Sequence, residues 1–130
     1  MVKTRGIAHM SIPVTDIERS REFYCKHLGM KMLAIVKNMV FLDAGGDCVI
    51  LVGVDRPIST AGVPDVHQAF IVAHDEYEAA VRELRESGVE VVFEEDRRGG
   101  VVNGPRAYFN DPDGNALEII DLTSYETQRR

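Results

Sequence analysis

Three residues of types that commonly bind metal ions stand out in this sequence, a histidine at matching points of each half and a glutamate in the second half. His9 lies in an alternating run over residues 7–12, and His67 lies in a similar run over residues 66–72. Glu118 lies in the apolar run that closes the second half. Two neutral imidazoles and one carboxylate suit Fe(II), Mn(II) or another borderline divalent ion and leave positions open for a chelating substrate. The pattern therefore predicts a metal site at the junction of the halves.

Glu118 is the strongest single indication of this site. A carboxylate flanked by Leu117 and Ile119 in a strand is costly to bury unless it is paired or bound to a metal. A glutamate at the rim of a sheet is the alternative. A lone strand histidine is more often a hydrogen-bonded core imidazole than a ligand, but matching positions in a repeat favour the metal.

Two further side chains are candidates for catalysis. Tyr108 could donate a proton or a hydrogen bond to a ligand, although an aromatic ring that fills the core is about as common. Ser11 shares a strand face with His9 and is a weaker candidate donor. Arg98 and Arg106 could hold an anionic substrate group, but solvated charges are the default interpretation.

The first half, about residues 6–54, predicts one helix and four strands. Alternation indicates a strand over 6–14, and Thr15 with Glu18 predicts a capping box for a helix that ends near Gly29. Three further strands are predicted, over 31–37, 40–42 and 48–54. A polar segment with two prolines, about residues 55–65, then predicts a linker.

The second half, about residues 66–122, repeats this order. A strand over 66–73 leads to a capping box of Asp75 and Glu78, to a helix that ends at Gly88, and to strands over 89–93, 106–110 and 116–121. Residues 94–104 predict a charged, glycine-rich loop of a kind that could act as a lid. His74, at the start of the second helix, is expected to be exposed.

These elements predict the α+β class. Two βαβββ modules cannot each bury the apolar face of a four-stranded sheet, so we expect them to pair in one domain spanning residues 1–130. The expected product is a concave, incompletely closed eight-stranded sheet with its helices outside. Exposed sheet edges and the length of the linker also predict a homodimer.

Composition excludes several classes of protein. The chain of 130 residues has a net charge of −6 and no long basic run, which argues against nucleic acid as a partner. Cys25 and Cys48 show no metal-finger or redox spacing and favour a reducing, cytoplasmic compartment. The first residues lack the apolar core of a signal peptide, and no apolar run reaches membrane-spanning length, so no membrane partner is expected.

The chain resembles the vicinal oxygen chelate superfamily, which includes glyoxalase I, fosfomycin-resistance thiol transferases, extradiol dioxygenases and bleomycin-binding proteins. The resemblance covers nearly the whole sequence. It rests on Ile7-Ala8-His9, Phe23-Tyr24, Leu28-Gly29-Met30, His67-Gln68-Ala69-Phe70 and the signature-like run Tyr108-Phe109-Asn110-Asp111-Pro112-Asp113-Gly114-Asn115-Ala116-Leu117-Glu118.

The resemblance implies roles for several residues. His9, His67 and Glu118 match the metal-ligand positions, and Tyr108 matches a tyrosine that contacts substrate in several members. Ser11 matches a hydroxyl residue of the fosfomycin transferases. It also implies that the two chains of a dimer can share the ligands of one site.

Differences between this sequence and particular members of the superfamily argue against some of their activities. Glyoxalase I uses a second glutamate from the first half, where this chain has Ile50 or Leu51. Extradiol enzymes carry a further histidine before the middle ligand, and residues 48–66 contain none. Bleomycin-binding members lack the three ligands.

The sequence thus predicts an enzyme that uses one divalent metal ion per site, with Fe(II) or Mn(II) favoured over Ni(II) or Zn(II). Its small substrate would chelate the ion through adjacent oxygens, in a dioxygenase-like, lyase-like or transferase-like reaction. The alternative is a non-catalytic protein that binds a small molecule or sequesters an antibiotic.

Overall fold

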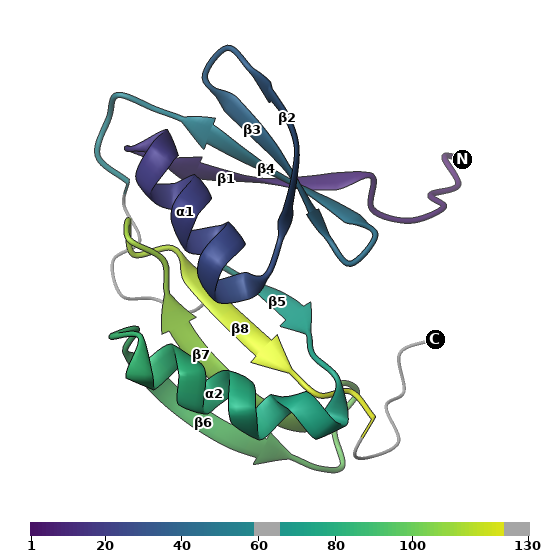
Figure 1. The fold of residues 1–130 in the computed structure, drawn as a ribbon. Coiled ribbons are helices and arrows are strands. Elements are labelled where there is room, and N and C mark those ends of the chain that lie inside the picture. The colour runs from purple at the N-terminus through teal and green to yellow at the C-terminus, as the bar shows by residue number, and fades with distance from the viewer. Residues whose placement is uncertain (59–65, 124–130) are drawn as a thin grey trace. The chain divides into compact units, whose positions relative to one another are not determined.

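The computed structural model describes residues 1–58 and 66–123 and divides into two compact units, residues 1–59 and 60–130. Each unit is a four-stranded mixed sheet with one α-helix packed on one face (Figure 1). The two βαβββ modules and the α+β class are therefore confirmed. The end of the predicted linker, residues 59–65, lies outside the described residues, and the single domain stays a prediction.

Unit 1 contains β1 (His9–Val14), α1 (Ile17–Leu28), β2 (Lys31–Val36), β3 (Met39–Ala44) and β4 (Asp47–Gly53). The strand order is β1-β4-β3-β2; β1 runs parallel to β4, and the other neighbours are antiparallel. The helix packs on β3 and β4. Its apolar side chains and those of the sheet form a core that includes Ile12, Val14, Phe23, Tyr24, Val40, Leu42, Val49 and Leu51.

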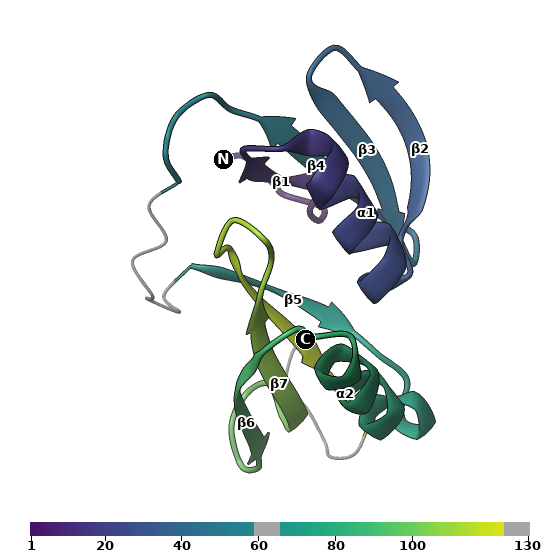
Figure 2. The same cartoon turned by 60° about the vertical axis from the view of Figure 1, so that its left-hand side comes forward.

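Unit 2 repeats this topology with β5 (His67–Ile71), a 3₁₀ turn η1 (His74–Glu76), α2 (Tyr77–Glu86), β6 (Val91–Arg97), β7 (Gly104–Asn110) and β8 (Ala116–Ile120). The order β5-β8-β7-β6 again has its parallel pair at one edge. Figure 2 shows α2 lying along its own sheet. No helix among the described residues is long and apolar enough to cross a membrane.

Each sheet has one face under its helix and one opposite face, which we call the helix-free face. In β1, Ile12 and Val14 are buried under the helix, while His9 and Ser11 alternate with them and are exposed. In β5, His67 is exposed as well. The alternation predicted from the sequence thus places both histidines on helix-free faces.

The structure corrects both predicted capping boxes. In α1 the N-cap is Asp16, whose carboxylate accepts from the Arg19 amide at 3.0 Å, and Glu18 instead pairs with Arg21 at 2.9 Å. In α2, which begins at Tyr77, no side chain caps the helix. The 3₁₀ turn leads directly into the helix, and within that turn the Glu76 amide donates to the Ala73 carbonyl at 3.0 Å.

The structure also extends β6 into the predicted loop 94–104. The charged side chains of this part of β6 form ion pairs at the edge of the sheet. Glu94 pairs with Arg85 of the helix at 2.6 Å, and Glu95 pairs with Arg97 at 2.7 Å. Edge strands carry such charges readily, because they help to prevent pairing with other chains. The other strands begin and end within a few residues of prediction.

Substitution of Gly104, at the start of β7, is expected to destabilise the protein strongly. Its φ is +130°, and a Cβ atom there would overlap the carbonyl oxygen of Asp121. Gly104→Ala should lower the free energy of unfolding by about 2–4 kcal/mol, from backbone strain plus the steric clash. Chemical denaturation measures this. Gly45→Ala is the matched control, because Gly45 also has positive φ, +69°, but an added Cβ would meet no atom within 4 Å. Equal losses in the two variants would contradict the steric account.

Candidate metal centre

The strand register of unit 2 places two candidate residues, Glu118 and Tyr108, in one row across the sheet. Glu118 in β8 lies opposite Tyr108 in β7 and opposite Ala69 in β5. Phe93 in β6 extends the row beyond Tyr108. Residues paired across strands share a face of the sheet. Because Leu117 is fully buried on the helix side, this row lies on the helix-free face.

A hydrogen-bonded turn sets the entry into β8. The carboxylate of Asp111 accepts from the amides of Asp113 and Asn115 at 2.9 and 2.8 Å, and from the Asn115 side chain at 2.8 Å. Gly114 adopts φ +84°, which few other residues tolerate. The turn thereby fixes the position of the strand that carries Glu118.

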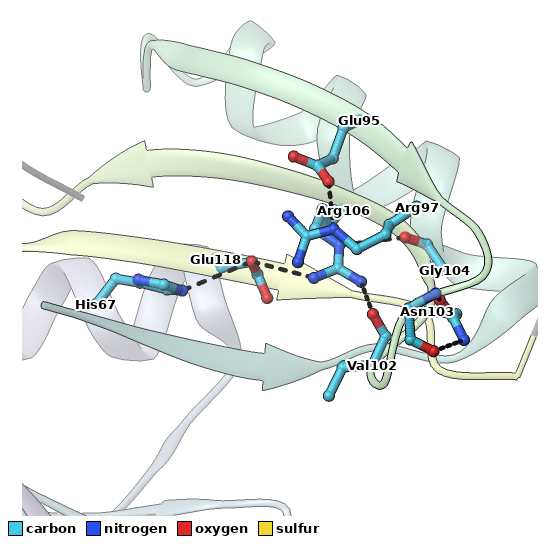
Figure 3. A network of polar contacts seen from close by, with 9 residues as sticks. His67, Glu95, Arg97, Val102, Asn103, Gly104, Arg106 and Glu118 are labelled. Atoms are coloured by element: carbon cyan, nitrogen blue, oxygen red, sulfur yellow. Dashed lines mark hydrogen bonds and ion pairs between the residues drawn. The ribbon is translucent and has the colours of Figure 1, made fainter. Parts of the chain in front are cut away.

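Glu118 is 3% exposed and lies between an imidazole and a guanidinium (Figure 3). Its Oε1 is 3.8 Å from His67 Nε2 and 3.9 Å from Arg106 Nη1. Protein ligands bind divalent ions at about 2.1 Å, so two neighbouring donors on one ion lie about 3–3.5 Å apart. A small side-chain movement would bring His67 and Glu118 to that spacing. This pair therefore fits a divalent ion.

Tyr108 lies beside both of these groups. Its ring centroid is 5.7 Å from that of His67 and 5.8 Å from that of Phe93. Burial raises the pKa of the Tyr108 phenol, and its hydrogen bond to Glu118 and the charge of that carboxylate raise it further, against a lowering effect of Arg106. Tyr108 is therefore a protonated phenol at neutral pH, able to donate a hydrogen bond.

Arg106 is buried, contrary to the default expectation of a solvated charge. Only 3% of it is exposed. Its Nη2 donates to the carbonyl of Val102 at 2.8 Å and its Nε to that of Gly104 at 3.2 Å. The alternation of β7 showed that Arg106 and Tyr108 share a face, but no signal in the sequence indicated that a loop would cover the arginine.

The two sheets show which residue of unit 1 matches Glu118. His9 lies opposite Cys48 as His67 lies opposite Ala116. Two residues further along, Ser11 lies opposite Ile50 as Ala69 lies opposite Glu118. The matching residue is therefore Ile50 and not Leu51, which is buried under the helix. Unit 1 has no carboxylate at this point.

The structure brings His67, Glu118 and Tyr108 together within unit 2. His9 and Ser11 lie on the helix-free face of unit 1. Across residues 1–58 and 66–123, no three His, Cys, Asp or Glu side chains are grouped closely enough to hold one ion. Among the described residues of unit 2, the His67–Glu118 pair thus has no third His, Cys, Asp or Glu side chain close enough to share an ion.

A contact between His74 and Asp121, at the end of β8, was not predicted from the sequence. The side chain of His74 is 71% exposed, as expected, but its Nδ1 lies 2.8 Å from the Asp121 carboxylate, which is 1% exposed. That carboxylate also accepts from the amide and hydroxyl of Thr123, both at 2.7 Å. The hydrogen bond and the charge of Asp121 raise the pKa of His74.

This contact predicts a pH-dependent contribution to stability. Because the folded-state pKa of His74 is raised, the charged pair stabilises the protein fully below the unfolded-state pKa of about 6.5, and the contribution is lost as pH rises through the folded-state value. The difference in unfolding free energy between wild type and His74→Gln should shrink from pH 6 to pH 9. Urea denaturation at several pH values measures it. A difference that stays constant or grows over this range would contradict the assignment.

The two βαβββ modules, with a histidine at the start of each first strand and a carboxylate in the final strand, match the pattern on which the resemblance to the vicinal oxygen chelate superfamily rests. The family model of the Glyoxalase/Bleomycin resistance protein/Dioxygenase superfamily matches residues 6–119. The chain belongs to this superfamily, as its resemblance to the vicinal oxygen chelate proteins implied.

Named relatives come from several organisms. The chain is 28% identical to the metallothiol transferase FosB of Lysinibacillus sphaericus, over 88% of this chain and 81% of that protein. It is also 28% identical to the glyoxalase domain-containing protein RDO1 of Mycosarcoma maydis, over 96% and 71%. The fosfomycin resistance protein FosX of Listeria monocytogenes has the same fold, with a TM-score of 0.78 and 20% identity over 94% and 97% of the two chains.

Proposed function

We propose that this protein is a divalent-metal-dependent enzyme acting on a small substrate that offers two adjacent oxygens. His9, His67 and Glu118 would hold the ion. The observation that carries the proposal is the buried Glu118 carboxylate, 3.8 Å from an exposed imidazole on the helix-free face of the sheet. A glutamate-to-glutamine variant of FosX from Listeria monocytogenes, 19% identical to this chain, was crystallised with Mn(II) and 1S,2S-dihydroxypropylphosphonic acid, which supports Mn(II) as the ion to test first.

The bound ion would supply Lewis-acid chemistry, polarising the substrate oxygens. The chain's own residues would orient the substrate. Tyr108 is placed to donate a hydrogen bond to an oxygen near Glu118, since its raised pKa keeps the phenol protonated. Ser11 lies on the same face and strand as His9 and is the weaker candidate donor.

Transfer of a nucleophile to an electrophilic substrate is the reaction type that the relatives favour. Besides FosB, the glutathione transferase FosA of Serratia marcescens is 25% identical over 88% of this chain. Isomerisation of the glyoxalase I kind lacks its base, because Ile50 stands where a second glutamate would be needed. Extradiol cleavage lacks its additional histidine in residues 48–66.

Parallel assays separate these reactions. Protein loaded with Mn(II) or Fe(II) is incubated with an epoxide such as fosfomycin plus a thiol, and separately with catechols while oxygen uptake is recorded. We expect loss of the epoxide with formation of a thiol adduct. Tight binding of such ligands without any turnover would instead indicate a sequestering protein, and oxygen uptake would indicate a dioxygenase.

We also propose a homodimer in which His9 of one chain completes the His67–Glu118 pair of the other. Neither His9→Ala nor Glu118→Ala should bind metal tightly alone. In a mixture, random pairing should restore about a quarter of the sites, because one site of each heterodimer keeps all three ligands. Metal titration of the mixture after subunit exchange measures this. A monomer by light scattering would contradict the proposal.

A further inference from the structure

Arg106 places a positive charge beside Glu118, where the proposed reaction gives it no role. Both side chains are only 4% exposed, and Arg106 Nη1 lies 3.9 Å from Glu118 Oε1. This separation is too long for a hydrogen bond. The attraction is therefore between two buried opposite charges, which solvent screens much less than a surface pair.

The same guanidinium holds the loop of residues 98–103. Its other donors bind the carbonyls of Val102 and Gly104, at the end of that loop. Within the loop, the Asn103 side chain accepts from the Gly100 amide at 2.7 Å and donates to the Gly100 carbonyl at 2.8 Å. The loop is folded on itself, and Arg106 joins it to the carboxylate of the candidate site (Figure 3).

The fold itself does not require arginine at this position. Arg106 lies opposite Ile120 in β8, and the matching residue of unit 1 is Met39, which lies opposite Val52 in β4. A methionine therefore fits this place in an equivalent sheet. The charge at Arg106 calls for a functional explanation rather than a topological one.

We propose that Arg106 couples the position of the 98–103 loop to occupancy of the metal site, an inference that rests on the proposed function. When Glu118 holds a divalent ion, its negative charge is no longer available to Arg106, and the guanidinium is repelled. The hydrogen bonds to Val102 and Gly104 then weaken and the loop loosens. Coupling between two equilibria is reciprocal. If the bound ion weakens the pairing of Arg106 with Glu118 by some factor, that pairing must lower the affinity of the site for the ion by the same factor.

Two measurements test this coupling. In Mn(II) titrations followed by electron paramagnetic resonance, Arg106→Met should bind Mn(II) about 5-fold to 150-fold more tightly than wild type, the usual range of such couplings. The Mn(II) affinity of Arg106→Lys should lie between those of wild type and Arg106→Met, because lysine keeps the charge but lacks the planar guanidinium group. Arg85→Met is the matched control, since Arg85 pairs with Glu94 away from the site and its loss should leave affinity unchanged.

Hydrogen exchange reports on the loop itself. Amides of residues 98–104 should exchange faster in wild type with Mn(II) than without it, and fast under both conditions in Arg106→Met. Unchanged or weaker Mn(II) affinity in both Arg106 variants, or a wild-type loop insensitive to bound Mn(II), overturns the coupling alone. A wild-type protein that binds no divalent ion overturns the proposed function and the coupling together.

Discussion

Replacing Glu118 with alanine is expected to lower the affinity for a divalent ion by more than about 100-fold. Substitution of groups that only orient metal ligands already lowers metal affinity by about 10-fold to 100-fold, and loss of a ligand should lower it more. Glu118→Gln should show a similar loss, because a neutral amide is a much weaker ligand than a carboxylate. Equilibrium dialysis followed by elemental analysis measures the bound ion.

Glu95→Ala is the matched control for this experiment. Glu95 lies opposite Arg106 on the same sheet face, but its carboxylate pairs with Arg97 at 2.7 Å rather than with an imidazole. Its removal should leave metal affinity within a few-fold of wild type. If both glutamate variants kept full affinity, the ion would be held elsewhere, and the assignment of Glu118 would be wrong.

The second large effect is an absence of glyoxalase I activity. With any divalent ion, turnover of the glutathione hemithioacetal of methylglyoxal should be about 100-fold to 10,000-fold below that of a true glyoxalase I, the usual contribution of a positioned base. The reason lies in β4, where Ile50 occupies the place that Glu118 has in β8. Isomerisation moves a proton between adjacent carbons and needs a base there.

The assay requires protein of known metal content, with a glyoxalase I as the positive control. Activity of the epoxide-and-thiol reaction in the same preparation would show that the site is competent. Efficient conversion of the hemithioacetal by this protein would mean that another residue acts as the base. The interpretation of the first module would then need revision.

Much of the fold could be predicted because apolar and polar side chains alternate along the strands of both halves. Residues such as Ile12 and Val14 alternate with His9 and Ser11, and this pattern survives in the sheet. The end of α1 near Gly29 could also be predicted, because the residue after a helix often adopts the left-handed backbone conformation, which glycine favours. The precise N-caps were not predictable, because Thr15 and Asp16 are both good capping residues and the geometry of the turn decides between them.

Matching positions in the two halves singled out His9 and His67 as candidates, and the apolar neighbours of Glu118 singled out that carboxylate. The strand register then showed that Ile50 is the counterpart of Glu118. Two contacts of the structure could not be predicted. The burial of Arg106 depends on how residues 98–103 fold over it, and the contact of His74 with Asp121 joins residues 47 positions apart. Neither follows a local period, so no pattern in the sequence could reveal it.

Binding of a divalent ion by two histidines and a glutamate can be measured by titrating chelator-treated wild-type protein with Mn(II). Electron paramagnetic resonance then counts free and bound ions. We expect one tightly bound ion per chain, and we expect His9→Ala, His67→Ala and Glu118→Ala each to lose it. Absence of binding in wild type, together with no thermal stabilisation by Mn(II), Fe(II), Ni(II) or Zn(II), would contradict this expectation.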